Sequence, residues 1–281
     1  MNIKRMLNKK IIIDDIIQSY HNICNSGFIS NTALEYHSEY SKKYNCNLYI
    51  KREDQQIVRS FKIRGAYNKI YSLDREQRKN IICASAGNHA QGFAYICNKL
   101  SLNGTIYIPE TTPTQKINRI NYFSNNSCDI KVYGKNFIEC LDQAKLVSEK
   151  ENKTFIHPYD DIETIHGQAT IAKEIYNCIE PDVLISCIGG GGLISGIGLY
   201  SKLINPKCLI LGAQPDSCPT MIESLYTNSL VSKKIEDNFV DGASVGQVGE
   251  ITFDLCKEYV DRIYTASNGR ICEEILNLYN N

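Results

Sequence analysis

The stretch Val183-Leu184-Ile185-Ser186-Cys187-Ile188 is followed by the four glycines Gly189 to Gly192 and then by Leu193 to Leu203. The first part predicts a buried β-strand and the last part an apolar helix. Glycines at such a junction leave backbone amides accessible, and a helix N-terminus favours an anion. A tight turn alone would need only one or two glycines. We therefore predict a strand, a phosphate-binding loop and a helix in succession.

The same alternation of apolar strand-like runs and helical segments extends along the chain and predicts an α/β fold with parallel strands. A helix is expected after Lys62, and another near Pro113. The expected strands, in chain order, are Leu48–Lys51, Ile81–Ser85, Gly104–Ile108, Asp129–Tyr133, Thr154–His157, Val183–Ile188, Cys208–Ala213 and Tyr259–Tyr264.

Composition narrows the class of protein. The chain has 281 residues, of which 43% are hydrophobic, so it can bury a large core. Its 31 basic and 31 acidic residues balance, so electrostatics does not favour a nucleic acid or membrane partner. The basic stretch Met1–Lys10 leads into three isoleucines, but Asp14 and Asp15 interrupt them before they reach the length of a signal peptide. We expect a soluble, cytoplasmic protein.

The twelve cysteines lie singly, without a Cys-x-x-Cys pair or a histidine at zinc-ligand spacing. Several, such as Cys83, Cys97 and Cys187, fall in apolar segments. Buried, reduced thiols therefore explain them better than disulfides or a metal site. The five histidines are also scattered, so we expect no metal ion.

The ligand of the glycine loop can be narrowed by its flanking residues. A dinucleotide-binding loop would read G-x-G-x-x-G, but here Ser195 occupies the position of the third glycine when the motif begins at Gly190. Such a loop also needs an acid at the end of the next strand, where this chain has Gln214. A nucleotide P-loop would need Gly-Lys-Ser or Gly-Lys-Thr, which does not follow the glycines. A phosphorylated aldehyde cofactor fits better, because it also accounts for a lysine in an apolar frame.

That lysine is Lys62, in Ser60-Phe61-Lys62-Ile63-Arg64-Gly65-Ala66-Tyr67. A desolvated lysine at the first turn of a helix loses its proton readily and can form a Schiff base with an aldehyde. A third segment, Ser85-Ala86-Gly87-Asn88-His89, turns from a strand into a helix and offers amides to a carboxylate. Read alone, the third segment is more typical of a helix cap made by Asn88 or Ser85.

Together, Ser-Phe-Lys-x-Arg-Gly-Ala, Ala-Ser-Ala-Gly-Asn-His-Ala-Gln-Gly and Gly-Gly-Gly-Gly-Leu-x-Ser-Gly resemble the threonine dehydratase (threonine ammonia-lyase) family. The members of that family are pyridoxal-phosphate enzymes of the tryptophan synthase β-subunit type. The resemblance runs from about Ser30 to the C-terminus and includes Lys51-Arg52-Glu53-Asp54 and Phe239 to Val245.

The resemblance implies a role for each matching residue. Lys62 is the Schiff-base lysine and Phe61 packs on the ring of the cofactor, pyridoxal 5'-phosphate. Asn88 bonds the phenolic oxygen of that ring. The phosphate loop consists of Gly189, Gly190, Gly191, Gly192 and Leu193, and the substrate carboxylate lies against Ser85, Ala86, Gly87, Asn88 and His89.

The implied fold has two three-layer α/β/α domains. Residues 1–79 and 158–281 would form a large cofactor-binding domain, and residues 80–157 a small domain that closes over the substrate. Relatives continue past Asn281 through a helix and a final strand, so the large domain is expected to be incomplete at its C-terminus.

The implied activity is deamination of L-threonine to 2-oxobutanoate and ammonia, and also of L-serine to pyruvate, in isoleucine biosynthesis or threonine catabolism, by a homo-oligomer (dimer or tetramer). Serine racemases carry a serine where Ala86 stands, so elimination is favoured over racemisation. Gln214 replaces a frequent acid, and Cys218 and Thr220 are poor ligands, so no tight divalent site is expected. Two alternatives stay open: a non-catalytic, truncated or degenerate paralogue that still binds the cofactor, and a serine racemase, serine dehydratase or β-replacement enzyme.

Overall fold

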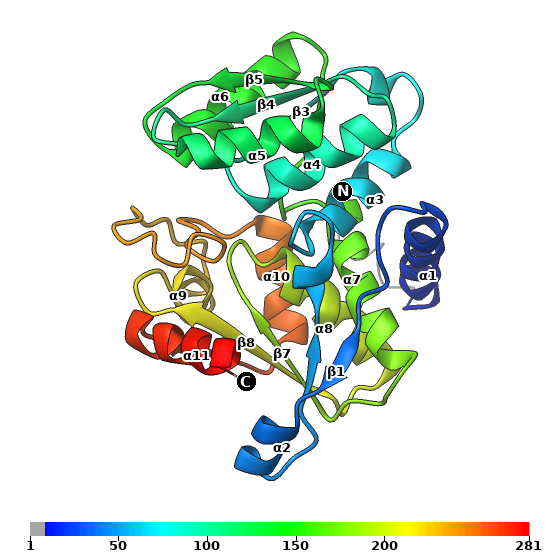
Figure 1. Cartoon of the computed structure of the whole chain (residues 1–281), viewed down its shortest axis with the longest axis vertical. Coiled ribbons are helices and arrows are strands. Elements are labelled where there is room, and N and C mark those ends of the chain that lie inside the picture. The colour runs from blue at the N-terminus through cyan, green and yellow to red at the C-terminus, as the bar shows by residue number, and fades with distance from the viewer. Residues whose placement is uncertain (1–8, 281) are drawn as a thin grey trace.

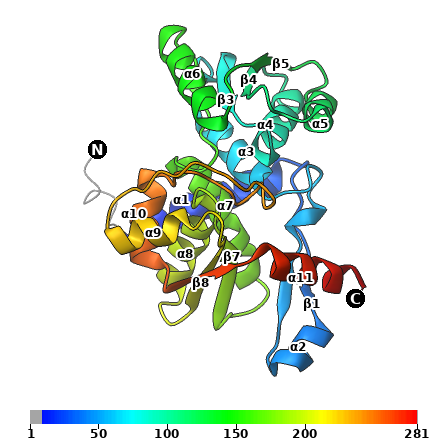
Figure 2. The same ribbon diagram turned by 90° about the vertical axis from the view of Figure 1, so that its left-hand side faces the viewer.

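The structure is a computed structural model that describes residues 9–280, so Asn281 and most of the basic stretch Met1–Lys10 lie outside the described residues. Two parallel sheets and one antiparallel hairpin are present in the described part. Figure 1 shows the sheets one above the other, with α3 (Lys62–Ser72) at their junction, and Figure 2 shows the same from the side. The predicted α/β fold with parallel sheets is therefore confirmed.

The upper sheet has the order β5-β4-β3-β6. Apolar side chains alternate between its two faces, as strand geometry requires. Ile81, Cys83, Ile106 and Ile108 pack toward α4 and α5, and the opposite face packs on α6. The elements of this layer are β3 (Ile81–Ala84), β4 (Gly104–Ile108), β5 (Cys128–Val132), β6 (Thr154–Phe155), α4 (Asn88–Lys99), α5 (Thr114–Ser124) and α6 (Phe137–Lys150).

The lower sheet has the order β7-β8-β9. One face, with Leu184, Ile210 and Ile263, packs against the helices α8 and α10. The opposite face carries Val183 and Ile185, which are 41% and 71% exposed. The elements are β7 (Val183–Cys187), β8 (Leu209–Pro215), β9 (Arg262–Ala266), α8 (Gly192–Ile204), α9 (Thr220–Thr227) and α10 (Glu250–Tyr259), with α11 (Asn268–Asn280) following β9.

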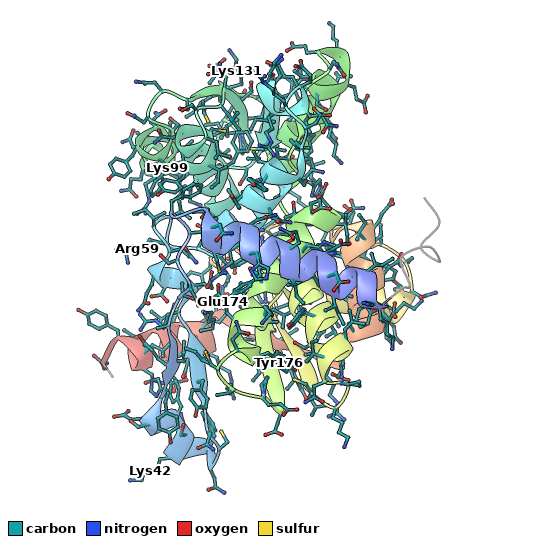
Figure 3. All side chains as sticks on the ribbon, turned by 90° about the vertical axis from the view of Figure 1, so that its right-hand side faces the viewer. Lys42, Arg59, Lys99, Lys131, Glu174 and Tyr176 are labelled. Carbon is teal, nitrogen blue, oxygen red and sulfur yellow. The ribbon has the colours of Figure 1, made fainter. Side chains whose placement is uncertain are left out.

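The remaining elements hold the lower part together. The buried face of α1 (Lys9–Asn25) carries Ile12, Ile16 and Ile23, and the helix packs on α7 (Ile162–Tyr176). The hairpin of β1 (Leu34–Tyr36) and β2 (Tyr49–Lys51), with α2 (Ser38–Tyr44) at its tip, extends from the lower sheet (Figure 1). Short 3₁₀ turns cover Glu53–Gln55 and Gln77–Lys79. Figure 3 shows Lys42, Lys99 and Lys131 projecting outward, whereas Glu174 lies in the interior.

All eight predicted strands are present, with ends that match the prediction or differ from it by one to three residues. The prediction of Tyr259–Tyr264 was wrong at its start, because Tyr259 ends α10 and the strand begins at Arg262. Phe253 and Cys256 are buried three residues apart on one face of α10, and this spacing favours a helix over a strand in the segment that ends at Tyr259. Leu34–Tyr36 was missed as a strand, and it pairs antiparallel to β2. The helical faces predicted after Lys62 and near Pro113 are confirmed, since Ile63, Ile70 and Ile120 are fully buried.

All twelve cysteines are free thiols. Cys83 and Cys97 are buried as predicted, but Cys187 is exposed, since it lies on the same open face of β7 as Val183 and Ile185. None of the described helices combines the length and apolar character needed to cross a bilayer.

Candidate active site

Lys62 is the first residue of α3, where the side chain of Ser60 accepts a hydrogen bond from its backbone amide (3.2 Å). Its Nζ donates a hydrogen bond to the carbonyl oxygen of Pro158 at 2.8 Å. Nζ also lies 5.4 Å from the ring centre of Phe61 and 5.9 Å from that of Tyr159. The ring of Phe61, which belongs to the apolar frame of the lysine, therefore lies near the amine, and Tyr159 adds a second ring.

Packing around this amine lowers the pKa of Lys62 to about 8, because the charged form is deprived of water. No carboxylate among the described residues forms an ion pair with it. The nearby thiol of Cys187 acts in the opposite direction and raises the pKa of Lys62, but the loss of water outweighs it. At pH 7 about a tenth of Lys62 is therefore the free amine, roughly 300 times more than for an ordinary lysine.

The glycine loop turns through Gly191, whose φ of +99° suits only glycine, and α8 begins at Gly192. A Cβ at Gly190 would lie 2.4 Å from the ring of Tyr159, so glycine is also required by the close approach of that ring. Thr252 Oγ1 holds the loop by donating to the carbonyl oxygen of Gly190 at 2.7 Å. The amides of Gly189 to Gly192 bond to no described acceptor, so they stay available to an anion.

The segment after β6 supports this loop. The carboxylate of Asp160 accepts hydrogen bonds from the amides of Glu250, Ile251 and Thr252, at 2.9 to 3.2 Å, and so caps α10. His157 Nδ1 accepts from the amides of Tyr159 and Asp160. These bonds fix the position of Tyr159 beneath the glycines.

The loop Ser85–His89 faces the glycine loop across an open space. A Cβ at Gly87 would meet no atom within 4 Å, and one at Gly242 would meet only Asn88 Nδ2, at 3.9 Å. Gly242 in turn adjoins the glycines, because a Cβ at Gly189 would lie 3.0 Å from its carbonyl oxygen. The side chain of Asn88 is exposed toward this space. The space beside Gly87 and Gly242 is thus unfilled, with Asn88 Nδ2 at its edge.

The side chains of this loop are not all available to a ligand. Ser85 Oγ accepts from the amide of Gly87 (3.2 Å), the residue that precedes the first turn of α4. His89 is buried, with Nε2 3.1 Å from the carbonyl oxygen of Ile156, and burial lowers its pKa to about 3. His89 can therefore offer only its backbone amide, whereas Ala86 and Gly87 leave the loop open.

Four functional candidates were missed by sequence reasoning: Pro158, Tyr159, Asp160 and Thr252. For the first three, the signal lies in His157, which follows β6 just as Ser85 follows the adjacent parallel strand β3. Ligands bind beyond the carboxyl ends of parallel strands, so this segment could have been grouped with Ser85–His89.

Leu193, the last residue of the predicted phosphate loop, is half-buried among apolar side chains, so it can offer only its backbone amide to a ligand.

Gln214, which stands where the family often has an acid, has its side-chain oxygen occupied by bonds within the protein. Its Oε1 accepts from the amides of Met221 and Ile222, at 3.1 and 3.2 Å, at the N-terminus of α9. Thr220 and Cys218 both donate to the carbonyl oxygen of Val245. No group of three or more His, Cys, Asp or Glu side chains among the described residues is placed to hold a metal ion.

These residues fit pyridoxal phosphate. A lysine amine with a lowered pKa lies beside a stacking ring, glycine amides at a helix N-terminus suit a phosphate, and an open space with an amide donor separates the two loops.

Comparison with known proteins agrees with this fit. The family model described as "Pyridoxal-phosphate dependent enzyme" matches residues 26–281. The chain is 43% identical over 274 residues to "L-threonine dehydratase biosynthetic IlvA" of Halalkalibacterium halodurans, covering 96% of this chain but 66% of that protein. It is 41% identical over 276 residues to the protein of the same name from Bacillus subtilis, covering 97% and 65%. The chain thus spans just under two thirds of the length of these curated relatives.

Solved structures show the same likeness. The processed form of threonine deaminase isoform 2 from Solanum lycopersicum superposes with a TM-score of 0.87 at 38% identity, over 95% of this chain and 78% of that one. Maize serine racemase also gives a TM-score of 0.87, at 28% identity, over 93% and 78%.

Proposed function

The chain belongs to the pyridoxal-phosphate-dependent enzyme family, and we propose that it deaminates L-threonine to 2-oxobutanoate and ammonia, and also acts on L-serine to give pyruvate. The observation that carries the proposal is Lys62 at the first turn of α3, with a pKa of about 8 and its Nζ on the Pro158 carbonyl. The ring of Tyr159 lies near both this amine and the loop of four glycines. The identity to proteins named L-threonine dehydratase supports the choice of substrate and a role in isoleucine biosynthesis, with threonine catabolism the other setting.

Each site residue has a task in this proposal. Lys62 would hold the cofactor through Nζ, and its amine, once freed by the incoming amino acid, would take the proton from the α-carbon, for which a pKa near neutrality is suited. Phe61 packs on the cofactor ring and Asn88 donates to its phenolic oxygen. The amides of Gly189 to Leu193 hold the phosphate. The loop Ser85 to His89 holds the substrate carboxylate, chiefly through the amides of Ala86, Asn88 and His89, because those of Ser85 and Gly87 already donate to the carbonyl oxygen of Tyr107 and to Ser85 Oγ. Bound pyridoxal phosphate would supply the electron sink that makes the α-proton removable.

Ala86 supports elimination over racemisation. Returning a proton to the opposite face of the α-carbon needs a second proton carrier, and a methyl group cannot be one. L-Serine should therefore give pyruvate faster than D-serine. The reverse ratio would assign the chain to the racemases instead.

The division into residues 1–79 with 158–281 and residues 80–157 is part of the proposal. It is supported by the upper sheet, whose strands all lie between Ile81 and Phe155. Lys116 on α5 forms an ion pair with Asp241 in the loop before α10, which bridges the two parts over the open space. We expect closure to bring Ser85–His89 toward the glycine loop.

The test begins with adding pyridoxal phosphate and recording the absorbance band of the lysine adduct. The band should form in the wild type and in Lys99→Ala, an exposed lysine on α4, but not in Lys62→Ala. Release of 2-oxobutanoate from L-threonine then tests turnover. A band without turnover favours the non-catalytic paralogue, and a band in Lys62→Ala contradicts the assignment of the lysine.

A cytoplasmic location and a homo-oligomer, dimer or tetramer, complete the proposal. The names of the bacterial biosynthetic relatives support a metabolic enzyme. Light scattering after size-exclusion chromatography, with and without pyridoxal phosphate, tests the oligomeric state.

A further inference from the structure

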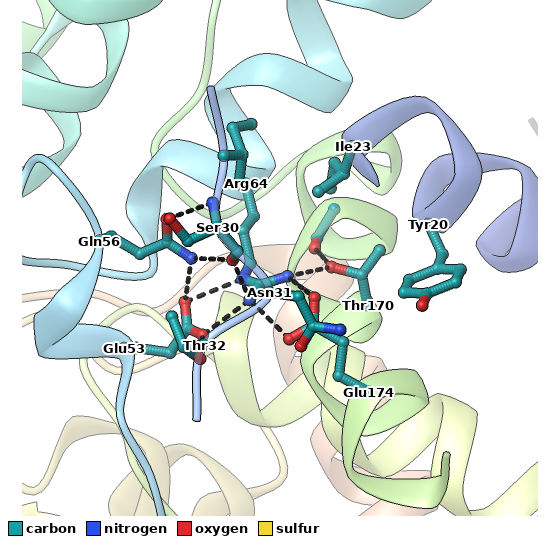
Figure 4. Close-up of polar contacts among 12 residues, drawn as sticks. Tyr20, Ile23, Ser30, Asn31, Thr32, Glu53, Gln56, Arg64, Thr170 and Glu174 are labelled. Carbon is teal, nitrogen blue, oxygen red and sulfur yellow. Dashed lines mark hydrogen bonds and ion pairs between the residues drawn. The ribbon is translucent and has the colours of Figure 1, made fainter. Parts of the chain in front are cut away.

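A cluster of four charged side chains lies in the interior beside the site, and we name it the Arg64 cluster: Lys51, Glu53, Arg64 and Glu174. Figure 4 shows Glu53, Arg64 and Glu174. Arg64 is fully buried and bonds two carboxylates at once. Its Nε and Nη2 donate to Glu53 at 2.8 and 2.7 Å, and its Nη1 and Nη2 donate to Glu174 at 2.7 and 2.8 Å. Bidentate contacts of this kind fix the orientation of the guanidinium plane as well as its position.

The cluster is balanced in charge. Lys51 Nζ completes it, at 2.6 Å from Glu174 and 2.5 Å from the carbonyl oxygen of Thr32. Burial alone would raise the pKa of the Glu53 carboxyl, but the bonds and charge of Arg64 lower it, so the acid stays ionised. Two cations and two anions therefore neutralise each other with little access to water.

The cluster connects segments far apart in the chain. Glu174 lies on α7, Glu53 in the turn after β2, and Arg64 on the first turn of α3, 110 residues before Glu174. Arg64 also bonds Thr170 Oγ1 and the carbonyl oxygen of Ser30, both at 3.2 Å. Figure 4 shows these groups converging on the guanidinium from several directions.

The same turn of α3 is also confined by close backbone contacts with α4 and α7. A Cβ at Gly92 of α4 would lie 3.2 Å from the backbone of Ile63, and one at Gly167 of α7 would lie 2.7 Å from the carbonyl oxygen of Arg64. Neighbouring helices therefore approach the backbone of α3 directly after Lys62. The charged cluster supplies the remaining constraint, on the side of α3 that faces α7 and the turn after β2.

We propose that Arg64 is a positioning residue for Lys62: its guanidinium, held between Glu53 and Glu174, fixes the first turn of α3 so that the Lys62 amine stays against the Pro158 carbonyl. The inference rests on the proposed function, in which Lys62 is the lysine that carries the cofactor. It assigns a task to Lys51 and Glu53 of the Lys51–Asp54 motif, which the site itself does not use.

The test compares Arg64→Lys with Arg52→Lys. Arg52 also bonds two carboxylates, but these are Glu35 and Asp54, outside α3, and its side chain is 33% exposed, so it is a matched control. In the full chain freed of cofactor, each lysine is labelled by reductive methylation from pH 6.5 to 10 and quantified by mass spectrometry. The pH midpoint for Lys62 reports its ionisation separately from its accessibility.

We expect a midpoint near pH 8 in the wild type and in Arg52→Lys. In Arg64→Lys the turn loosens, water reaches the amine, and the midpoint rises by about one pH unit or more. Labelling at pH 8 then falls about fivefold, since the free amine drops from about half to about a tenth. An unchanged midpoint in a folded Arg64→Lys protein overturns the proposal, because a merely structural cluster would lower the melting temperature without moving this midpoint.

A milder variant keeps the test decisive if Arg64→Lys does not fold. Thr170→Val removes one bond to Arg64 without disturbing the charge balance, and should raise the midpoint in the same direction by a smaller amount. If Arg64→Lys is unfolded by circular dichroism, an unshifted Thr170→Val overturns the inference. A failure of the proposed function is detected by a different measurement, because the absorbance band of the cofactor adduct would then persist in Lys62→Ala.

Discussion

Replacing Gly167 by alanine tests the packing on which the site depends. Gly167 lies on α7 where it crosses α3, and an ideal Cβ there would be 2.7 Å from both the carbonyl oxygen of Arg64 and the Cα of Gly65. Both are backbone atoms, so no side chain can rotate away. The helices must separate by about 0.7 Å, the difference between 2.7 Å and the ordinary contact limit of 3.4 Å.

The expected magnitude follows from two opposing effects. Overpacking of a dense core costs about 1 to 3 kcal/mol, and alanine regains about 1 kcal/mol over glycine in a helix. The carbonyl carbon of Arg64, at 2.9 Å, is a third backbone atom in the way, which places the cost in the upper part of that range. We therefore expect Gly167→Ala to lose about 1 to 2 kcal/mol of unfolding free energy and about 2 to 8 °C in melting temperature. Since Lys62 begins α3, its amine moves with that helix.

Gly269→Ala on α11 is the matched control, because a Cβ there would meet no atom within 4 Å. This variant should be as stable as the wild type or up to about 1 kcal/mol more stable. Urea unfolding followed by circular dichroism measures both variants. If Gly167→Ala proves as stable as Gly269→Ala, the close approach of α3 and α7 is refuted.

Three further predictions concern the surroundings of the site. Asp160→Ala removes the cap of α10 and should cost about 1 to 3 kcal/mol in urea unfolding, whereas Asp160→Asn, which keeps one acceptor oxygen, should cost less. Burial lowers the pKa of both His89 and His157 to about 3, so the unfolded chain binds more protons between about pH 6.5 and pH 3, and the unfolding free energy falls as the pH drops. Each histidine contributes up to about 1.4 kcal/mol per pH unit to the pH dependence of the unfolding free energy. His157→Asn should therefore reduce the slope of the unfolding free energy against pH, measured between about pH 6 and pH 5, by the contribution of one histidine. Lys116→Ala breaks a half-exposed ion pair with Asp241 and should change stability by less than about 1 kcal/mol, with an effect that shrinks at high salt; a larger, salt-independent loss would contradict this.

Local pattern determined much of this protein. The alternation of apolar runs predicts the strands β3, β4 and β7 closely, since strand and helix periodicity are properties of neighbouring residues. The four glycines after β7 and the frame of Lys62 likewise indicate a phosphate loop and an amine of lowered pKa before any fold is known. These signals are local because they depend on backbone freedom and on nearby side chains.

Only the tertiary structure decided which groups meet. The carbonyl oxygen that binds Lys62 lies 96 residues further along the chain, on Pro158, and the carboxylate of Glu174 lies 110 residues from Arg64. His89 illustrates the same limit, since its place in a motif suggested a ligand contact, but packing turns its ring into the core. Periodicity cannot specify such pairs, because their distances are set by how whole helices and sheets pack, and burial of the same side chains sets the pKa values on which the chemistry depends.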